Sequence, residues 1–144
     1  LNIYIGEMAG KVLPEAFTCF TLSLDNLSEL TKRFGYTVGD GVLKDFAGLV
    51  QLMGDTEGMR GYNGIGRFVV FFEECSSKKA AAMIRILDNQ VEEYNSLNPE
   101  YPIRYTAAWA TTEETDTYEI RELLRLSQKK WKQMEKEKEQ SSYS

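Results

Sequence analysis

Five consecutive apolar residues, Phe68 to Phe72, constrain the fold of this chain more than any other feature. Shortly before them stands Asn63-Gly64, a dipeptide typical of tight hairpin turns, with Gly66 close by. A continuous apolar run that follows a hairpin turn is typical of a central strand. The sequence therefore predicts a hairpin over residues 60–72 whose second strand lies inside a sheet.

The remaining segments alternate between strand and helix patterns. Further strands are predicted over residues 16–24 and 103–109, where apolar side chains alternate with others. Helices are predicted over residues 27–34, 37–53 and 76–98, and from 116 into the charged end of the chain. Split βαβ folds with an added helix have this order of elements. The predicted fold class is therefore α+β and ferredoxin-like, a mainly antiparallel sheet covered by helices.

Helix boundaries are marked by residues suited to caps. Gly35 is expected to end the first of these helices, and Thr37 with Asp40 resembles a capping box that opens the next one. Ser76 or Ser77 is expected to cap the following helix, and Asp116 the last one.

The composition excludes several classes of function. The 144 residues include 42% hydrophobic residues, enough for the core of one domain, and the net charge of −5 disfavours a nucleic-acid partner. The chain has no histidine, which excludes serine–histidine and cysteine–histidine hydrolases. No apolar run is long enough to cross a membrane. Cys19 and Cys75 are expected to be free buried thiols, which indicates a reducing, cytoplasmic setting.

Two segments resemble the GGDEF family of diguanylate cyclase domains. Residues 22–27, LSLDNL, and 34–43, FGYTVGDGVL, are similar to the family segment D-I-D-x-F-K-x-x-N-D-x-x-G-H-x-x-G-D-x-x-L. Residues 64–68, GIGRF, stand where the family carries its Gly-Gly-Asp-Glu-Phe signature. The resemblance implies a nucleotide-cyclase-type fold. The size and the residue pattern predict a single GGDEF-like domain over 1–144, with an ordered core at about 16–135 and a charged tail at 136–144. Because the chain starts at Leu1, we expect it to come from a longer protein.

The departures from the family pattern fall on its metal site. In active members the first Asp of D-I-D and the third signature residue hold two divalent metals that align the GTP phosphates. Here these positions are Ser23 and Gly66, and the fourth signature position is Arg67. Mg²⁺ demands oxygen ligands, and neither glycine nor arginine supplies one from its side chain. The family's guanine-contacting Asn falls on Thr31, a lysine of the first helix on Ser28, and the phosphate-side lysine on or near Glu135.

The candidate nucleotide-binding residues are Asp40, Asn63, Gly64, Gly66 and Arg67. The turn glycines could present N–H groups to a phosphate with help from Arg67, or form an ordinary hairpin turn. Asp40 could contact guanine or favour its helix dipole. No metal site is predicted; Asp25 is a weak candidate ligand, and the alternative is a turn or cap role.

The sequence favours a catalytically inactive GGDEF-like domain of a bacterial signalling protein that docks, dimerises or senses a nucleotide. No cofactor is expected, with Mg²⁺ only alongside residual nucleotide binding. Expected partners are other domains of the parent protein or a second copy, and GTP or cyclic di-GMP. One alternative is weak diguanylate cyclase or nucleotide hydrolase activity. The other is a ferredoxin-like interaction module that binds no nucleotide.

Overall fold

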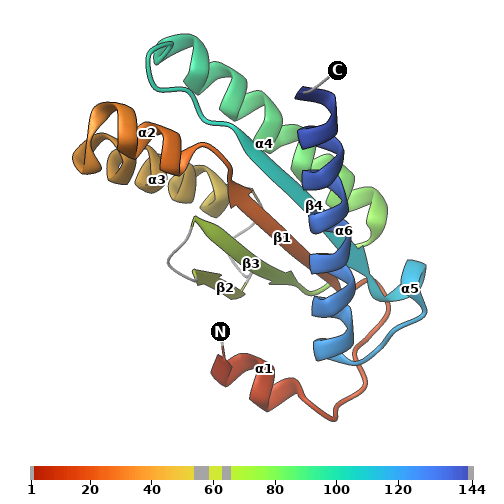
Figure 1. Cartoon of the computed structure of the whole chain (residues 1–144). Helices are drawn as coiled ribbons and strands as arrows, with labels where there is room; N and C mark the ends of the chain where they lie inside the picture. Colours follow the sequence, from red (N-terminus) through yellow and green to blue (C-terminus); the bar gives the residue numbers. More distant parts are fainter. Residues whose placement is uncertain (1, 54–58, 63–65, 143–144) are drawn as a thin grey trace.

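The structure, a computed structural model, describes residues 2–53, 59–62 and 66–142 (Figure 1). Its elements are α1 (Asn2–Met8), β1 (Thr18–Leu24), α2 (Leu27–Phe34), α3 (Tyr36–Gln51), β2 (Met59–Tyr62), β3 (Arg67–Phe72), α4 (Ser77–Leu97), β4 (Tyr105–Thr111), α5 (Thr112–Thr115) and α6 (Ile120–Ser142). Within the described residues no helix is both long and apolar enough to cross a membrane.

The four strands form one sheet in the order β2-β3-β1-β4, and every neighbouring pair is antiparallel. Phe20 at the middle of β1 pairs with Val70 of β3 and Trp109 of β4. The predicted hairpin is confirmed, because β2 pairs with β3, and its apolar second strand lies between two others. The α+β class and the antiparallel sheet are confirmed with it. Asn63 and Gly64 of the predicted turn lie outside the described residues.

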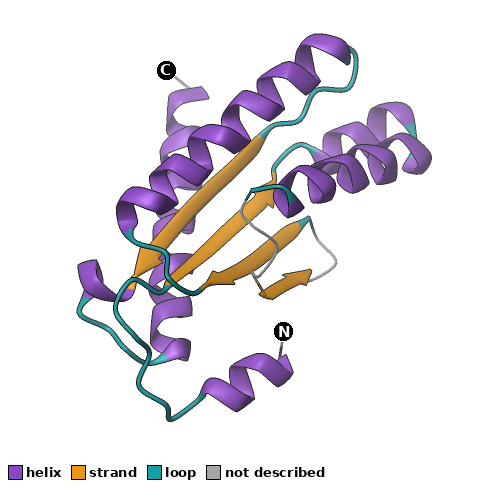
Figure 2. Ribbon diagram, turned by 180° about the vertical axis from the view of Figure 1, so that it is seen from behind, coloured by secondary structure: helices purple, strands orange, loops and turns teal. Residues whose placement is uncertain are grey.

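Alternation along the strands divides the interior into two layers. Phe20, Leu22 and Val70 point to the face covered by α2, α3 and α4, where Phe46 of α3 packs edge-on against Phe68 with ring centroids 5.6 Å apart. The other face holds a second cluster: Leu13, Phe17, Cys19, Phe71, Ala110, Ile120 and Leu123. Figures 1 and 2 show α6 on one side of the sheet and α4 on the other. Residues of β1 with odd numbers therefore face α6.

The junction of α2 and α3 differs from the prediction. Gly35 ends α2 as expected, but the same residue also precedes α3, which begins at Tyr36 without a side-chain cap. The prediction of a capping box at Thr37 was wrong, because Gly35 alone, with a φ of 96°, forms the turn between α2 and α3. A Cβ added at Gly39 would lie 2.3 Å from Thr31 Oγ1, so this glycine permits the two helices to pack closely.

The caps of α4 and α6 gave one correct prediction and one error. Ser76 caps α4, and its Oγ accepts a hydrogen bond from Lys79 N at 3.2 Å. Asp116 does not cap α6: it has a φ of 51° at the end of α5, four residues before α6 begins. Glu119 takes that role, since its Oε2 accepts from Glu122 N at 3.0 Å.

Both ends of the chain add to the fold. The sequence did not predict α1, whose Tyr4 packs on Phe71 with ring centroids 5.5 Å apart. At the other end α6 continues as a helix to Ser142, into the segment 136–144 that was predicted as a charged tail. Cys19 and Cys75 are free and buried as expected, and burial raises the pKa of the Cys19 thiol to about 12.

Candidate functional site

A cleft of about 780 Å³ opens where β1 ends and where β3 and β4 begin, beside the C-terminal half of α6. Antiparallel pairing brings its strand residues together, because Ser23 of β1 pairs with Arg67 of β3 and Thr106 of β4. All three point to the face covered by α6, which supplies Trp131, Glu135, Lys138 and Glu139 to the lining. Leu24, Asp25, Arg104 and Tyr105 complete the wall.

Asp25 is held at the end of β1 by two hydroxyl groups. Its Oδ1 accepts a hydrogen bond from Ser23 Oγ at 2.6 Å, and its Oδ2 accepts one from Thr106 Oγ1 at 2.5 Å. The backbone N–H of Asp25 donates to Arg104 O at 2.8 Å, which fixes the residue between the two strands. Each carboxylate oxygen therefore already has a donor from the protein.

Lys138 of α6 brings a positive charge to the same carboxylate. Its Nζ donates to Tyr105 O at 2.6 Å and to Thr106 Oγ1 at 3.0 Å, and it lies 4.0 Å from Asp25 Oδ2. Thr106 thus accepts from the ammonium and donates to the carboxylate. Asp25 is the only carboxylate of the family segment D-I-D that this chain retains. The Lys138 ammonium lies on the side of it that a divalent cation would approach, and like charges repel.

Trp131 connects α6 to β1 and β3. The indole Nε1 donates to Ser23 Oγ at 2.8 Å, and the Arg67 guanidinium lies over the ring, 4.5 Å from its centroid. The ring itself is buried. Ser23 consequently accepts from the indole and donates to Asp25, while Arg67 is stacked as a cation on an aromatic face.

Glu135 lies one helical turn after Trp131 on the same side of α6. Partial burial and the nearby Asp25 raise the pKa of its carboxyl group, and Arg67 acts in the opposite direction. Because the pKa is raised in the folded state, ionisation of Glu135 opposes folding at neutral pH.

We predict that Glu135→Gln raises the free energy of unfolding at pH 7, by less than about 1 kcal/mol because the group is partly exposed. The gain over the wild type should shrink as the pH falls through the raised pKa of folded Glu135 toward the unfolded value of about 4.3, and should be small at pH 4 and below, where Glu135 is mostly protonated in both states. Urea unfolding at pH 7 and pH 4 measures both values. An equal gain at the two pH values would show that charge is not its cause.

The position of the third signature residue cannot supply a metal ligand from its side chain. Gly66 has a φ of 72°, and its carbonyl oxygen accepts from Leu24 N at 2.8 Å. A Cβ here would lie 3.4 Å from Leu24 O, an ordinary contact, so the positive φ rather than lack of space disfavours a larger residue. Within the described residues no group of three or more His, Cys, Asp or Glu side chains is placed to hold a metal ion. The donor set therefore does not fit the two-metal site of active relatives.

The structure brings together only some of the predicted site residues. Gly66, Arg67 and the weak candidate Asp25 meet at the cleft, whereas Asn63 and Gly64 lie outside the described residues. Asp40 lies on α3, across the sheet from α6, and its Oδ2 pairs with Lys44 Nζ at 2.9 Å.

Sequence reasoning missed most of the contribution of α6. It pointed to the position of Glu135 as that of the family's phosphate-side lysine, but it gave Trp131, Thr106 and Lys138 no role in the site. The spacing of Ser127, Trp131, Glu135 and Lys138 was the available signal, because steps of four, four and three place them on one helical face. Ser127 shares a hydrogen bond of 2.8 Å with Thr21, which confirms that this face follows β1.

The sheet, its helices and the cleft at the strand ends define an α+β domain of the nucleotide-cyclase type. A model of the family described as "Diguanylate cyclase, GGDEF domain" matches residues 8–141, and the chain belongs to this family. No curated protein matches the chain.

Solved structures show the same fold. The active GGEEF domain of a diguanylate cyclase from Vibrio cholerae is 19% identical with a TM-score of 0.74, and the match covers 84% of this chain and 77% of that one. An EAL/GGDEF domain protein from M. capsulatus is 13% identical with a TM-score of 0.72, covering 94% and 87%. A microbial GGDEF domain studied with bis-(3,5)-cyclic di-GMP is 25% identical with a TM-score of 0.61, covering 76% and 65%.

Proposed function

We propose that this chain is a GGDEF domain that does not synthesise cyclic di-GMP and instead regulates a larger bacterial signalling protein. One observation carries the proposal. Asp25, the retained carboxylate of the metal segment, is hydrogen-bonded to Ser23 and Thr106 and has the Lys138 ammonium 4.0 Å away. A carboxylate arranged in this way is part of an internal network.

Phosphoryl transfer explains why this arrangement matters. The reaction depends on positioning and on cations that neutralise charge developing on the phosphoryl oxygens. A protein ammonium can neutralise charge, but it cannot bridge phosphate oxygens and activate a hydroxyl as a coordinated metal does. Ser23, Gly66 and Arg67 stand where active members carry the carboxylates that recruit such a metal. Among the described residues, the carboxylates that do line the cleft are not placed as a group of three that could hold a metal ion. Low residual cyclase or hydrolase activity is therefore the less favoured function.

The regulatory role is supported by what the cleft retains. Its lining combines the cations Arg67, Arg104 and Lys138 with the carboxylates Asp25, Glu135 and Glu139. The two guanidinium groups supply hydrogen-bond donors for an anionic group without a metal. Nucleotide sensing is one form of regulation that this supports, and docking or dimerisation with other domains is another. The M. capsulatus relative is itself an EAL/GGDEF domain protein. Two buried thiols suit the reducing cytoplasm in which we place the domain.

The test is incubation of the purified domain with GTP and Mg²⁺ or Mn²⁺, with products separated by chromatography. We expect no cyclic di-GMP and no GTP hydrolysis above the buffer, with an active diguanylate cyclase domain as positive control. Any trace product should be compared in Asp25→Ala: product that disappears in this variant would overturn the proposal, whereas product that persists belongs to a contaminant.

Calorimetric titration separates the regulatory roles. GTP and cyclic di-GMP are titrated separately, each with and without Mg²⁺. Metal-independent binding that Arg67→Ala weakens supports nucleotide sensing at the cleft. Absence of binding by either nucleotide leaves docking or dimerisation, and the ferredoxin-like interaction module without nucleotide becomes the better description.

A further inference from the structure

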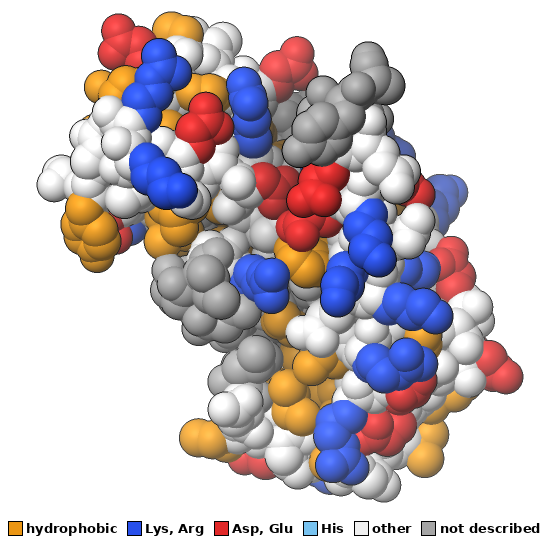
Figure 3. Space-filling model, in the orientation of Figure 1, with side chains coloured by type: hydrophobic (Ala, Val, Ile, Leu, Met, Phe, Trp, Pro, Cys, Tyr) orange, Lys and Arg blue, Asp and Glu red, His pale blue; other side chains and the backbone are white. Residues whose placement is uncertain are grey.

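Five basic residues lie along one face of α6. They are Arg121, Arg125, Lys129, Lys132 and Lys136, which follow one another at steps of four, four, three and four residues. Residues at these steps are neighbours on a helix surface, so the five form a single row, the basic stripe. The row is about 22 Å long at a rise of about 1.5 Å per residue. Figure 3 shows Lys and Arg side chains following α6 on the face turned to the viewer.

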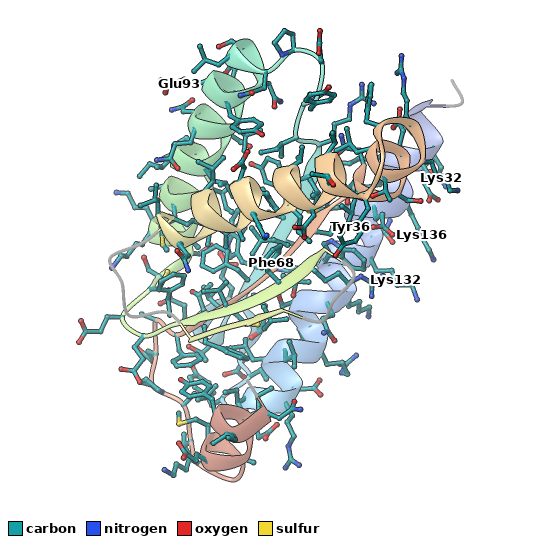
Figure 4. The ribbon with its side chains drawn as sticks, turned by 90° about the vertical axis from the view of Figure 1, so that its left-hand side faces the viewer. Lys32, Tyr36, Phe68, Glu93, Lys132 and Lys136 are labelled. Atoms are coloured by element: carbon teal, nitrogen blue, oxygen red, sulfur yellow. The ribbon has the colours of Figure 1, made fainter. Side chains whose placement is uncertain are left out.

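The basic stripe is self-repelling. Like charges at these spacings destabilise a helix by about 0.2–0.5 kcal/mol per pair. Arg121 and Arg125 are compensated by ion pairs with Glu119 and Glu122. Among the described residues, Lys129, Lys132 and Lys136 form no ion pair, although Lys132 acts on Glu135 at longer range. Figure 4 shows Lys132 and Lys136 on the opposite side of the molecule from Glu93 of α4. Three neighbouring ammonium groups are thus left for an external anion.

A small pocket adjoins the stripe. It has a volume of about 260 Å³ and lies between α6 and the face of β3 that is turned to α6. Its apolar side chains are Val69 and Trp131, and Thr21, Arg67, Gln128 and Lys132 complete the lining. Phe68 also borders the pocket, but its ring packs on the other face of the sheet. α6 packs against β1 and β4, which leaves this part of β3 open beside the helix. The pocket offers a place for one apolar side chain next to a row of cations.

We propose that the basic stripe and this pocket form a docking surface for an acidic amphipathic segment of a partner protein. The stripe is one residue wide, and the carboxylates of Glu122 and Glu135 flank it on its two sides. A flat anionic membrane or a nucleic acid would meet these carboxylates and a domain of net charge −5. A narrow segment can contact the basic stripe without reaching the flanking carboxylates or most of the acidic surface of the domain. Its carboxylates would face the stripe, and one apolar side chain would enter the pocket. This proposal names the kind of partner for the docking role given under the proposed function. It does not depend on whether the cleft has cyclase activity.

The probe is a fluorescent 20-residue peptide of glutamate and alanine with one central leucine, followed by anisotropy at low salt. The triple variant Lys129→Glu, Lys132→Glu, Lys136→Glu should weaken binding by at least about tenfold. Lys130→Glu is the matched control for the single variant Lys132→Glu, because each changes the charge by two units and Lys130 lies on the other side of α6. Lys130→Glu should leave the affinity nearly unchanged, whereas Lys132→Glu should weaken binding. Replacing the peptide's leucine by serine should weaken binding as well. If the triple Lys→Glu variant does not fold, the triple Lys→Gln variant takes its place. It removes the three charges without reversing them and should also weaken binding.

Three results would overturn the proposal. They are absence of peptide binding at low salt, an equal loss with Lys130→Glu and Lys132→Glu, and tighter binding of phosphatidylserine vesicles or single-stranded DNA than of the peptide. None of them bears on the cyclase assay, so failure of the docking surface is distinguishable from failure of the silent cleft.

Discussion

Replacing Trp131 by alanine is expected to lower the free energy of unfolding by about 3 to 5 kcal/mol. The indole is buried between α6 and the sheet, donates to Ser23 Oγ and carries the Arg67 guanidinium on its face. The variant therefore loses buried apolar area, leaves a cavity and removes a donor from a buried hydroxyl. Urea unfolding followed by circular dichroism measures the change.

Trp131→Phe is the matched control. The phenyl ring keeps much of the packing and a face for Arg67, but it has no N–H for Ser23. Trp131→Phe should lower the free energy of unfolding by less than Trp131→Ala does, because the phenyl ring leaves a smaller cavity. A loss below about 1 kcal/mol for Trp131→Ala would mean that the indole does not anchor α6 to the sheet.

Ser23→Asp, which restores the first carboxylate of the family segment, should destabilise the metal-free protein by about 3 kcal/mol at neutral pH, as an uncompensated buried charge does. Ser23 is buried, and its Oγ lies 2.6 Å from Asp25 Oδ1, so a second carboxylate would stand directly beside the first. Repulsion between them raises the pKa of the pair above about 3.9. The loss should consequently fall below about pH 4 to that of an uncharged side chain of the same size, and grow as the pH rises.

Divalent cations separate this effect from simple misfit. Ser23→Asn has nearly the same size without the charge, so its cost should depend on neither pH nor metal. Mn²⁺ at a hundredfold excess over its Kd should restore about 2.7 kcal/mol to Ser23→Asp, and nothing to the wild type or to Ser23→Asn. Thermal unfolding with and without Mn²⁺ makes the comparison. Equal responses of Ser23→Asp and Ser23→Asn would contradict the charge argument.

Local patterns were sufficient to predict most of the fold. The apolar run of β3, the alternation of β1 and the caps at Gly35 and Ser76 are properties of neighbouring residues, and the structure confirms them. The errors occurred where one residue serves two elements or where a competing cap stands nearby. Gly35 ends one helix and precedes the next, and Glu119 displaces Asp116.

The candidate site was less predictable, because its residues come from segments far apart in the chain. The sequence identified Asp25 and Arg67 through the family resemblance. It could not show that Thr106 and Lys138 reach the same carboxylate, since this depends on strand pairing and on the path of α6. Ser23 was recognised as a lost ligand, and the structure adds that its hydroxyl joins Trp131 to Asp25.

Mn²⁺ binding to the wild-type domain, followed by electron paramagnetic resonance with and without GTP, tests the central claim most directly. If Asp25 belongs to an internal network beside the Lys138 ammonium, the signal of free Mn²⁺ should be unchanged by the protein alone, and the protein should add nothing to the Mn²⁺ that GTP binds by itself. A protein-dependent loss of free Mn²⁺ that disappears in Asp25→Ala would contradict the claim and return the cleft to the class of metal-dependent nucleotide sites.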